Sequence, residues 1–450
     1  MGILEINKQE KEAEIASFLK AGAIDSDAQL LFPNEPSRFL PRDLERFFIW
    51  ATEQGASDIT FQTLEQVFLE IYGKKYRVTN RKISQSEMQE IIVGMYESES
   101  AKAKLNGIED LDFAYEIKPE RGIRIRFRVN ATAISVEGNT GIQITARSIP
   151  SKPVEIKNMN LEKEIFENLY HKQGMIVVTG GTGSGKSTLL SSIIRYIAED
   201  PNSHKKILTY ESPIEFVYDE IEKPSTSISQ SEIGKHLRDF ASGTRNALRR
   251  KPDIILIGEA RDAETIGEAV TASMTGHLLY TTVHSNGFAD TIRRMVNVFP
   301  EGERNSKAVD IISSLKMVVS QRLVPSLDGK RVALREFVVF NDHIIDLLLE
   351  DLDNLTYACR KVLKLYGRSF LLDATEKHNE GKISEQLLKE FERSEKGTEK
   401  DVDLIKEKTK EKALKMMEDS SEEENNKEDG FLTFGIAEMK ENLKGENHGK

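Results

Sequence analysis

Cysteine is almost absent from this 450-residue chain, which contains only Cys359. One thiol cannot form an internal disulfide, and it cannot supply the several thiolates of a zinc or iron–sulfur cage. The eight histidines show no H-E-x-x-H or comparable metal-binding spacing. The composition therefore predicts a protein of a reducing compartment and excludes the disulfide-rich classes and the zinc sites built from cysteine.

Long apolar runs are also missing. The longest, such as 254–257 and 344–349, fall far short of the roughly 20 residues that a membrane-spanning helix needs. The first residues, MGILEINKQEKEAE, lack the basic and apolar regions of a signal peptide. We therefore expect a soluble cytoplasmic protein.

The chain has fewer basic than acidic residues: 63 Lys and Arg and 74 Asp and Glu give a net charge of −11. Non-specific binding to nucleic-acid phosphates needs positive charge, so this balance argues against a nucleic-acid motor. Residues 391–450 alone hold 17 acidic and 12 basic residues, which is nearly half of the acidic surplus. The remainder of the chain is only mildly acidic, and this weakens the charge argument.

The sequence divides into four predicted regions. Residues 1–32 form a charged extension that is compatible with a short amphipathic helix or with a poorly ordered arm. Residues 33–150 mix helical and strand patterns and end at a stiff segment, 149–153. Residues 154–390 alternate apolar strand-like runs with helices, which is typical of an α/β domain with a largely parallel sheet. Residues 391–450 are predicted to be a charged, disordered tail.

Local patterns place individual elements in both domains. In the first domain we expect helices over 42–54 and 84–95, the second opened by a capping box of Ser84 and Glu87. Strands are expected over 58–62, 66–72 and 76–79, with a hairpin formed by 123–133 and 141–148. In the second domain the predicted strands are 175–179, 207–210, 254–257 and 278–283, followed by a helical stretch over 341–390.

A glycine-rich loop carries the most specific functional motif, G-x-x-x-x-G-K-[ST]. Its residues are Gly180, Gly181, Thr182, Gly183, Ser184, Gly185, Lys186, Ser187 and Thr188. A strand-like run enters the loop and a helical pattern leaves it, so its backbone N–H groups can surround phosphates at a helix N-terminus. Lys186 would bind the β- and γ-phosphates, and the Ser187 hydroxyl would bind Mg²⁺. ATP is favoured because the guanine-type letters N-K-x-D occur only at 426–429, in the charged tail.

Carboxylates and histidines follow or flank three other strand-like runs. Glu259 comes after 254–257, where it could orient or deprotonate the attacking water. The Asp that often holds Mg²⁺ is absent one position earlier, so Glu211 and Glu215 become candidates for binding metal or catalytic water, against the alternative of surface acids at a turn. His277 and His284 flank 278–283 and would sense the γ-phosphate, unless they are structural histidines.

Four of these segments together resemble the ATPases of type II and type IV secretion systems and of type IV pili. They are the phosphate loop, YESPIEF at 210–216, ILIGEARD at 255–262 and TGHLLYTTVHS at 275–285, and the resemblance extends over about 33–385. Within that group, the sequence is most similar to the Dot/Icm type IVB secretion branch and its plasmid-conjugation relatives. The segments that carry this similarity are PNEPSRF, LTYESPIEFVYDEI, SQSEI, RNALRRKP and RVALREF. The branch with a four-cysteine zinc module is excluded by the single cysteine.

The resemblance implies a PAS-like α+β domain followed by a RecA-like P-loop ATPase domain, assembled as a homohexamer with Mg²⁺ and ATP. It implies a location peripheral to the bacterial inner membrane, inner-membrane secretion or conjugation components as partners, and no sequence-specific nucleic-acid contact. One of Arg124, Arg126 and Arg128, which alternate along a predicted strand, would reach the nucleotide and neutralise transition-state charge. A solvated strand face paired with acids is the alternative, and Arg245 and Arg249 form a second candidate pair.

Three other functions remain compatible with the sequence. A pilus-retraction motor would use the same chemistry on a different machine. A RecA-like nucleic-acid motor would show ATPase activity stimulated by single-stranded DNA and an affinity that depends on salt. A scaffold that binds ATP without hydrolysing it would release no phosphate.

Overall fold

The computed structural model describes residues 30–120, 123–149 and 152–394. The predicted tail from residue 395 and residues 1–29 of the predicted extension lie outside the described residues. The described residues fall into two compact units, 30–325 with 331–369 and 326–330 with 370–394. No helix among them is long and apolar enough to cross a membrane. The domain boundary expected at 149–153 stays a prediction.

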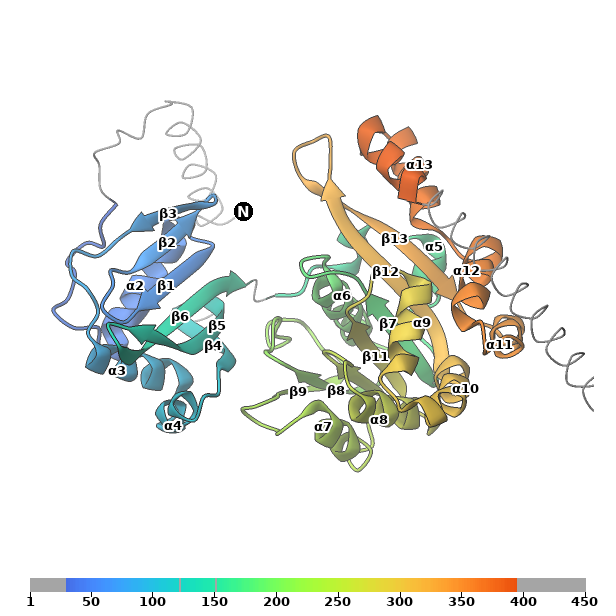
Figure 1. Ribbon diagram of the computed structural model, residues 1–450, viewed down its shortest axis with the longest axis horizontal. Coiled ribbons are helices and arrows are strands. Elements are labelled where there is room, and N and C mark those ends of the chain that lie inside the picture. Colours follow the sequence, from blue (N-terminus) through green and yellow to red (C-terminus); the bar gives the residue numbers. More distant parts are fainter. Residues whose placement is uncertain (1–29, 121–122, 150–151, 395–450) are drawn as a thin grey trace, which may run out of the picture. The chain divides into compact units, whose positions relative to one another are not determined.

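An antiparallel sheet, which we call the N-terminal sheet, forms the first part of the larger unit (Figure 1). Its strand order is β3-β2-β1-β6-β5-β4, with β1 Asp58–Gln62, β2 Phe68–Ile71, β3 Lys74–Arg77, β4 Leu111–Glu120, β5 Ile123–Val136 and β6 Asn139–Ile149. Its helices are α2 Pro41–Glu53, α3 Gln85–Tyr96 and α4 Ser100–Asn106. The predicted hairpin is confirmed by β5 and β6, in which Val136 lies opposite Asn139 across the turn.

Aromatic side chains fill the core between these helices and the N-terminal sheet. The ring of Phe47 on α2 lies 5.0 Å from that of Phe32 and 5.5 Å from that of Phe61 on β1, measured between centroids. Such edge-on pairs add to the free energy gained by burying the rings. Trp50, the single tryptophan of the chain, lies 5.8 Å from Phe47 and therefore reports on the packing of this core.

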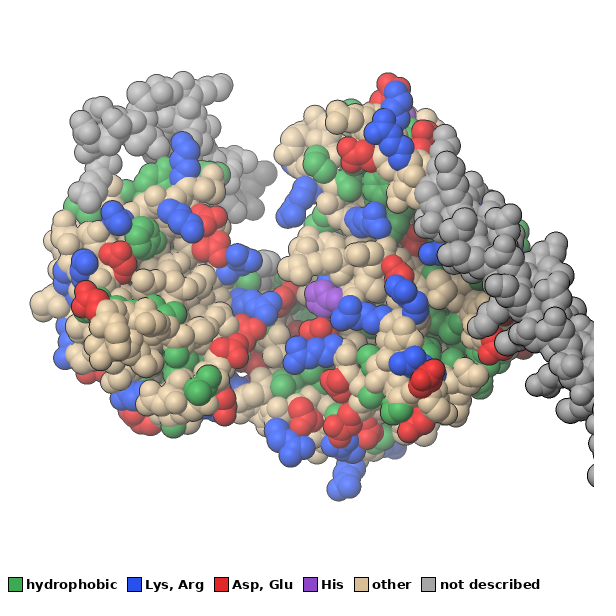
Figure 2. All heavy atoms as spheres, viewed as in Figure 1, with side chains coloured by type: hydrophobic (Ala, Val, Ile, Leu, Met, Phe, Trp, Pro, Cys, Tyr) green, Lys and Arg blue, Asp and Glu red, His purple; other side chains and the backbone are tan. Residues whose placement is uncertain are grey.

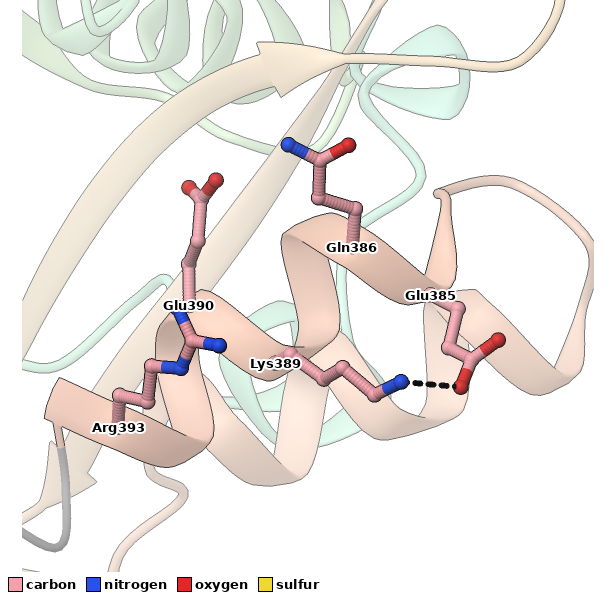
Figure 3. A pocket seen from close by; sticks show the side chains of 5 residues that line it. All are labelled: Glu385, Gln386, Lys389, Glu390 and Arg393. Atoms are coloured by element: carbon pink, nitrogen blue, oxygen red, sulfur yellow. Dashed lines mark ion pairs between the residues drawn. The ribbon is translucent and has the colours of Figure 1, made fainter.

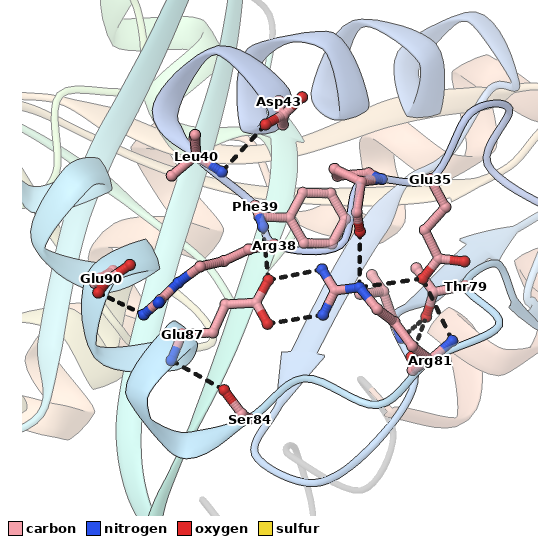
Figure 4. Close-up of polar contacts among 12 residues, drawn as sticks. Glu35, Arg38, Phe39, Leu40, Asp43, Thr79, Arg81, Ser84, Glu87 and Glu90 are labelled. Carbon is pink, nitrogen blue, oxygen red and sulfur yellow. Dashed lines mark hydrogen bonds and ion pairs between the residues drawn. The ribbon is translucent and has the colours of Figure 1, made fainter.

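A buried carboxylate fastens α3 to the segment that leads into α2 (Figure 4). Glu87 is only 3% exposed, and its oxygens accept hydrogen bonds from both terminal nitrogens of Arg81, each at 2.7 Å. The backbone N–H of Phe39 donates to the same carboxylate at 2.6 Å. Burial alone would raise the pKa of Glu87, but the Arg81 and Phe39 hydrogen bonds and the Arg81 charge outweigh it, so that the pKa is lowered.

Replacing Arg81 with methionine is expected to lower the free energy of unfolding by about 3 kcal/mol, because Glu87 would remain buried without its cation. Urea unfolding followed by Trp50 fluorescence measures this loss. Arg38→Met is the matched control: Arg38 pairs with Glu90 at the surface, with both side chains at least 43% exposed, and should cost less than about 1 kcal/mol. Equal losses of unfolding free energy in the two variants would contradict a stabilising role of the buried Arg81–Glu87 pair.

The same contact predicts a pH dependence with a definite sign. Because the folded-state pKa of Glu87 is lowered, its stabilising contribution is present above the ordinary glutamate value and is lost as pH falls through the lowered pKa. The difference in unfolding free energy between wild type and Arg81→Met should therefore be constant near neutral pH and shrink in acid. A difference that grows in acid would have the wrong sign.

A seven-stranded sheet forms the second part of the larger unit, in the order β13-β12-β7-β11-β10-β8-β9. Its strands are β7 Gly174–Thr179, β8 Lys206–Glu211, β9 Ser227–Glu232, β10 Ile254–Ile257, β11 Leu278–Val283, β12 Leu315–Pro325 and β13 Arg331–Val339. All neighbours pair in parallel except β12 and β13. The four predicted strands of this domain are confirmed and occupy the centre of the sheet.

Helices cover both faces of this sheet, so its central strands are buried on both sides. Met175 and Val177 of β7 point into a core built with α7 to α12, whereas Ile176 and Val178 point into a second core built with α5 and α6. The helices are α5 Lys163–Glu167, α6 Lys186–Glu199, α7 Phe240–Ala247, α8 Ala263–Met274, α9 Phe288–Asn297, α10 Arg304–Ser314, α11 Asp342–Leu349 and α12 Leu355–Tyr366. The predicted fold class, an α+β domain followed by an α/β domain, is confirmed.

The smaller unit contains α13 Phe370–Asn379, a helix over 385–394 and the loop 326–330. A hollow beside the second helix is lined by Glu385, Gln386, Lys389, Glu390 and Arg393 (Figure 3). Lys389 and Glu385, one turn apart, form an ion pair at 2.7 Å. This hollow presents only charged and amide side chains of a single helix, and none of the predicted site residues lines it.

Candidate nucleotide site

The phosphate loop connects the end of β7 to the start of α6 and is tightly enclosed at its first glycine. Gly180 has φ +148°, and a Cβ there would lie 2.3 Å from the carbonyl oxygen of Gln321 and 2.5 Å from Ser184 Oγ. Gly185, with φ +84°, immediately precedes α6. Both positions require glycine, since a side chain would clash or strain the backbone.

Lys186, the first residue of α6, folds back over this loop. It is 8% exposed, and its Nζ donates to the carbonyl oxygens of Gly180 at 3.0 Å and Gly181 at 2.9 Å. Burial lowers the pKa of Lys186, although the negative charges of Glu259 and Glu215 oppose this shift. Ser187 follows it with an exposed hydroxyl. The loop thus holds one buried cation beside an accessible hydroxyl at a helix N-terminus, as phosphate binding requires.

The order of the strands explains how the other candidate residues approach this loop. Within the sheet, β11 lies between β7 and β10, and β8 follows β10. The strands are parallel, so their carboxyl ends share one edge, where ligands of open α/β sheets bind. His284 after β11, Glu259 after β10 and Glu211 at the end of β8 therefore lie at the edge that carries the phosphate loop.

Glu259 and His284 lie close to one another at this edge. Glu259 Oε1 lies 3.9 Å from His284 Nε2, and both side chains are about one-third exposed, at 31% and 39%. Burial lowers the pKa of His284, and Lys186 lowers it further, while Glu259 opposes the shift. The lowered pKa favours the neutral imidazole, which can both donate and accept a hydrogen bond.

Buried hydroxyl groups hold the segment that follows His284. Thr179 Oγ1, at the end of β7, donates to the carbonyl oxygen of Val283 at 2.8 Å and contacts Ser285 Oγ. Ser285 Oγ in turn lies 2.7 Å from Thr291 Oγ1 on α9. This chain of contacts ties the position of His284 to the residue that precedes the phosphate loop.

The two carboxylates of the YESPIEF segment have different surroundings. Glu211 Oε1 accepts hydrogen bonds from Thr209 Oγ1 at 2.6 Å and Gln230 Nε2 at 3.1 Å. Burial raises the pKa of Glu211 to about 7 against the effect of these two bonds. The Glu215 side chain is 33% exposed and lies closer to solvent than that of Glu211. A carboxyl group that titrates near neutral pH suits proton transfer or water orientation at least as well as metal binding.

His277 is placed apart from the other candidates. It precedes β11, so a six-residue strand of about 20 Å separates it from His284. Its carbonyl oxygen accepts from Gly174 N at the start of β7, and its ring Nδ1 lies 3.1 Å from the carbonyl oxygen of Ala272. Within one chain, the structure gives no geometric support for γ-phosphate sensing by His277.

The three arginines of β5 all contact acidic groups or carbonyl oxygens. Arg126 is 3% exposed and donates to the carbonyl oxygens of Ile214 and Glu215, each at 2.6 Å. Arg124 pairs with Asp219 at 2.9 Å, and Arg128 pairs with Asp112 at 2.7 Å. These contacts match the alternative of a strand face paired with acids, and nucleotide binding by the arginines stays a prediction.

The second candidate pair, Arg245 and Arg249, lies on and just after α7. Arg245 is 42% exposed and bonds Glu264 at 2.7 Å and Glu268 at 3.0 Å, both on α8. Arg249 is exposed at the surface. Arg245 therefore links two neighbouring helices in this chain.

The donor set at the phosphate loop fits a nucleotide-bound Mg²⁺ better than a metal held by protein alone. Across residues 30–120, 123–149 and 152–394, no group of three or more His, Cys, Asp or Glu side chains could hold a metal ion. Mg²⁺ usually keeps several waters and is bound through one or two protein oxygens together with substrate phosphates. The exposed Ser187 hydroxyl at the start of α6 can provide such an oxygen.

Two buried polar residues beside the loop were not predicted as site residues. Gln321 on β12 donates to the carbonyl oxygen of Ser184 at 2.7 Å, and Arg335 on β13 donates to Gln321 at 2.8 Å. Both are 1% exposed. Ser184 belongs to the phosphate-loop motif, but no local pattern in the sequence pairs Gln321 with a residue 137 positions away.

The family described as type II/IV secretion system protein matches residues 35–423. A twitching motility protein of Neisseria gonorrhoeae is 37% identical over 287 residues, which are 63% of this chain and 72% of that protein.

Two solved structures are also similar. The X-ray structure of the Legionella pneumophila ATPase DotB is 47% identical with a TM-score of 0.77, and the match covers 81% of this chain and 99% of that one. The structure of the pilus retraction motor PilT with bound ADP is 30% identical with a TM-score of 0.65, and covers 77% and 96% of the two chains.

Proposed function

Because the chain belongs to the type II/IV secretion system proteins, a family of ATP-binding ATPases, we propose that it energises a type IVB secretion or plasmid conjugation apparatus. In this proposal it works as a homohexamer in the cytoplasm, peripheral to the bacterial inner membrane. Its partners are inner-membrane components of that apparatus. Hydrolysis of ATP is the step that drives the machine.

The phosphate loop is proposed to bind the triphosphate. The backbone N–H groups of 180–185 and the N-terminus of α6 surround the phosphates, and Lys186 exchanges its two carbonyl contacts for phosphate oxygens. Mg²⁺, held by Ser187, would neutralise charge on the β- and γ-phosphates. The carbonyl contacts keep the ammonium group poised over the loop, so little movement is needed.

Glu259 is proposed to orient and deprotonate the attacking water. In support, Glu259 follows β10, which is two strands from β7 in the parallel sheet, or about 10 Å between strand axes. His284, on the strand between them and 3.9 Å from Glu259, would sense the γ-phosphate. Glu211 and Glu215 would support water or metal from the next strand. Arginine contacts from a neighbouring subunit are the remaining part of this proposal.

The observation that carries the type IVB assignment is the likeness to the Legionella pneumophila ATPase DotB, which spans 99% of that chain at 47% identity. The pilus-retraction motor PilT matches at only 30% identity over a comparable length. The difference favours a secretion or conjugation machine over a retracting pilus.

Deletion of the gene in its own bacterium tests the assignment. We expect protein translocation or plasmid transfer to stop and twitching motility to continue, with restoration by the wild-type gene and not by one that encodes Glu259→Gln. Phosphate release by the purified protein is measured in parallel. Loss of twitching with normal secretion would overturn the type IVB proposal.

Pilus retraction is the second candidate, because the twitching motility protein of Neisseria gonorrhoeae is 37% identical and the chain spans 72% of it. It predicts the opposite outcome of the same deletion. The hydrolytic site is common to both candidates, so biochemical ATPase measurements alone do not separate them.

A further inference from the structure

A buried glutamine and arginine face each other across the two strands that end the seven-stranded sheet. Gln321 on β12 and Arg335 on β13 are paired in register, and each is 1% exposed. Arg335 Nε donates to Gln321 Oε1 at 2.8 Å. Burying a charged side chain this deeply costs free energy unless its hydrogen bonds are satisfied. The groups that satisfy them therefore indicate what this pair does.

One side of the pair reaches the phosphate loop. Ser320, the residue before Gln321, lies opposite Thr179 in the β12–β7 pairing, so Gln321 stands level with the start of the loop. Gln321 Nε2 donates to the carbonyl oxygen of Ser184 at 2.7 Å. A Cβ at Gly185 would come within 2.9 Å of the same nitrogen, which shows how closely the amide fits the loop.

The other side of the pair reaches the chain that precedes the phosphate-loop strand. Arg335 Nη2 donates to the carbonyl oxygen of Met159 at 2.9 Å, and Nη1 donates to that of Asn160 at 3.1 Å. Nη1 also lies 3.1 Å from a carboxylate oxygen of Glu162, whose side chain is 9% exposed. Every terminal nitrogen of the guanidinium is thus directed at residues 159–162.

From these contacts we infer that Gln321 and Arg335 are positioning residues that couple the phosphate loop to residues 156–162. Gln321 fixes the orientation of the Ser184 carbonyl group. It thereby also fixes the direction in which the loop N–H groups point, toward the phosphates. Arg335 transmits any shift of the loop to the turn at Met159 and Asn160. The inference rests on the proposed binding of nucleotide phosphates by this loop.

The coupling follows from how hydrogen-bonded groups in a dry interior behave. Neither side chain can exchange its partners for water, so a displaced Ser184 carbonyl would leave the Gln321 amide unsatisfied unless Arg335 and 159–162 moved with it. Phosphate binding that holds the loop in one conformation should therefore also restrict 156–162. In the absence of either positioning residue, the loop and this segment would respond separately.

The affinity of the full chain for ADP, measured by calorimetry, is the first test, because it does not require turnover. Gln321→Met keeps the side-chain volume but removes the contacts to Ser184 and Arg335, and we expect ADP to bind about tenfold more weakly. Arg335→Lys, which cannot reach Gln321, Glu162 and both carbonyls at once, should act in the same direction. The double variant should lose less than the product of the two single effects, because the residues act as one unit.

Ser320→Ala is the matched control. Ser320 is the buried neighbour of Gln321, with its side chain on the other face of β12, and its hydroxyl has no hydrogen-bond partner among the described residues. ADP affinity should stay within about twofold of wild type in this variant. A loss equal to that of Gln321→Met would mean that any change in this strand weakens binding, and would overturn the specific coupling.

Hydrogen exchange at residues 156–162 is the second test, and a purely structural role would not produce its expected result. At saturating ADP, exchange in this segment should slow in wild type and in Ser320→Ala, but not in Gln321→Met or Arg335→Lys, although the phosphate loop is protected in all four. If ADP does not change hydrogen exchange at 156–162 in wild type, or changes it equally in every variant, the coupling is overturned.

The outcomes also separate this inference from the proposed function. ADP binding by wild type with unchanged affinity in both positioning variants would overturn the inference alone. Failure of wild type to bind ADP at all would overturn the nucleotide site, and the inference with it. If Gln321→Met does not fold, Arg335→Lys provides both measurements.

Discussion

Glu259→Gln is expected to lower the rate of ATP hydrolysis by a factor of about 10²–10⁴ and to leave ATP affinity nearly unchanged. The amide has almost the same shape as the carboxylate but cannot accept the proton of the attacking water. Glu259 follows β10 at the carboxyl edge of the sheet and lies 3.9 Å from His284, so its exchange removes a negative charge without emptying space in the core. Phosphate release and equilibrium binding of ATP measure the two quantities separately.

Glu264→Gln provides the control for this variant. Glu264 lies five residues later on α8, is 64% exposed and pairs with Arg245 at the surface. Its exchange removes the same charge and should change neither rate nor affinity by more than about twofold. A Glu259→Gln enzyme that hydrolyses ATP at the wild-type rate would falsify the assignment of Glu259 as the catalytic carboxylate.

The central strands could be predicted from the sequence because burial on both faces makes them continuous apolar runs. β10 and β11 have the bounds that were predicted from the apolar runs 254–257 and 278–283. The strands that were missed include the sheet edges, where one side of the strand has no partner and polar residues are tolerated. β9, with the sequence SISQSE, and β4, which contains Pro119, are both edge strands.

Candidate site residues could be proposed from the sequence where the signal lies in neighbouring residues of the chain. The phosphate loop follows from eight consecutive residues, and Glu259 from its place directly after an apolar strand. The position of His284, and not His277, at the phosphate-loop edge required the direction of β11 within the sheet, which the spacing alone did not give. Gln321 and Arg335 required the pairing of β12 with both β7 and β13, contacts that join residues far apart in the sequence.

The arginines of β5 show the limit of pattern reasoning in another way. Their alternation correctly indicated three guanidinium groups on one strand, but a strand pattern does not identify the partners of a charge. In the structure Arg126 is buried against two carbonyl oxygens of the YESPIEF segment, and Arg124 and Arg128 pair with aspartates. Contact between these arginines and a nucleotide therefore stays a prediction.

Lys186→Met is expected to weaken ATP binding by about 10- to 100-fold, which corresponds to the loss of hydrogen bonds to a charged group. Methionine keeps most of the buried stem of the side chain, so the helix start should remain packed. Hydrolysis should fall further than binding, because the ammonium group also stabilises charge that develops on the phosphate in the transition state. Lys172→Met, at an exposed lysine before β7, is the control and should match wild type in both measurements.

The two site variants are most informative when they are compared, because they should fail at different steps. In wild type, Lys186 holds its ammonium group with two carbonyl oxygens of the loop at 2.9 and 3.0 Å, and phosphate oxygens would replace these acceptors. Its exchange should therefore raise the Kd for ATP, whereas exchange of Glu259 should leave the Kd nearly unchanged and lower the rate of hydrolysis. Titration of each variant with ATP distinguishes these results: saturating ATP restores occupancy to Lys186→Met, but no concentration restores hydrolysis to Glu259→Gln. If Lys186→Met bound ATP as tightly as wild type, the phosphates would have to lie elsewhere, and the whole arrangement of residues around this loop would lose its proposed function.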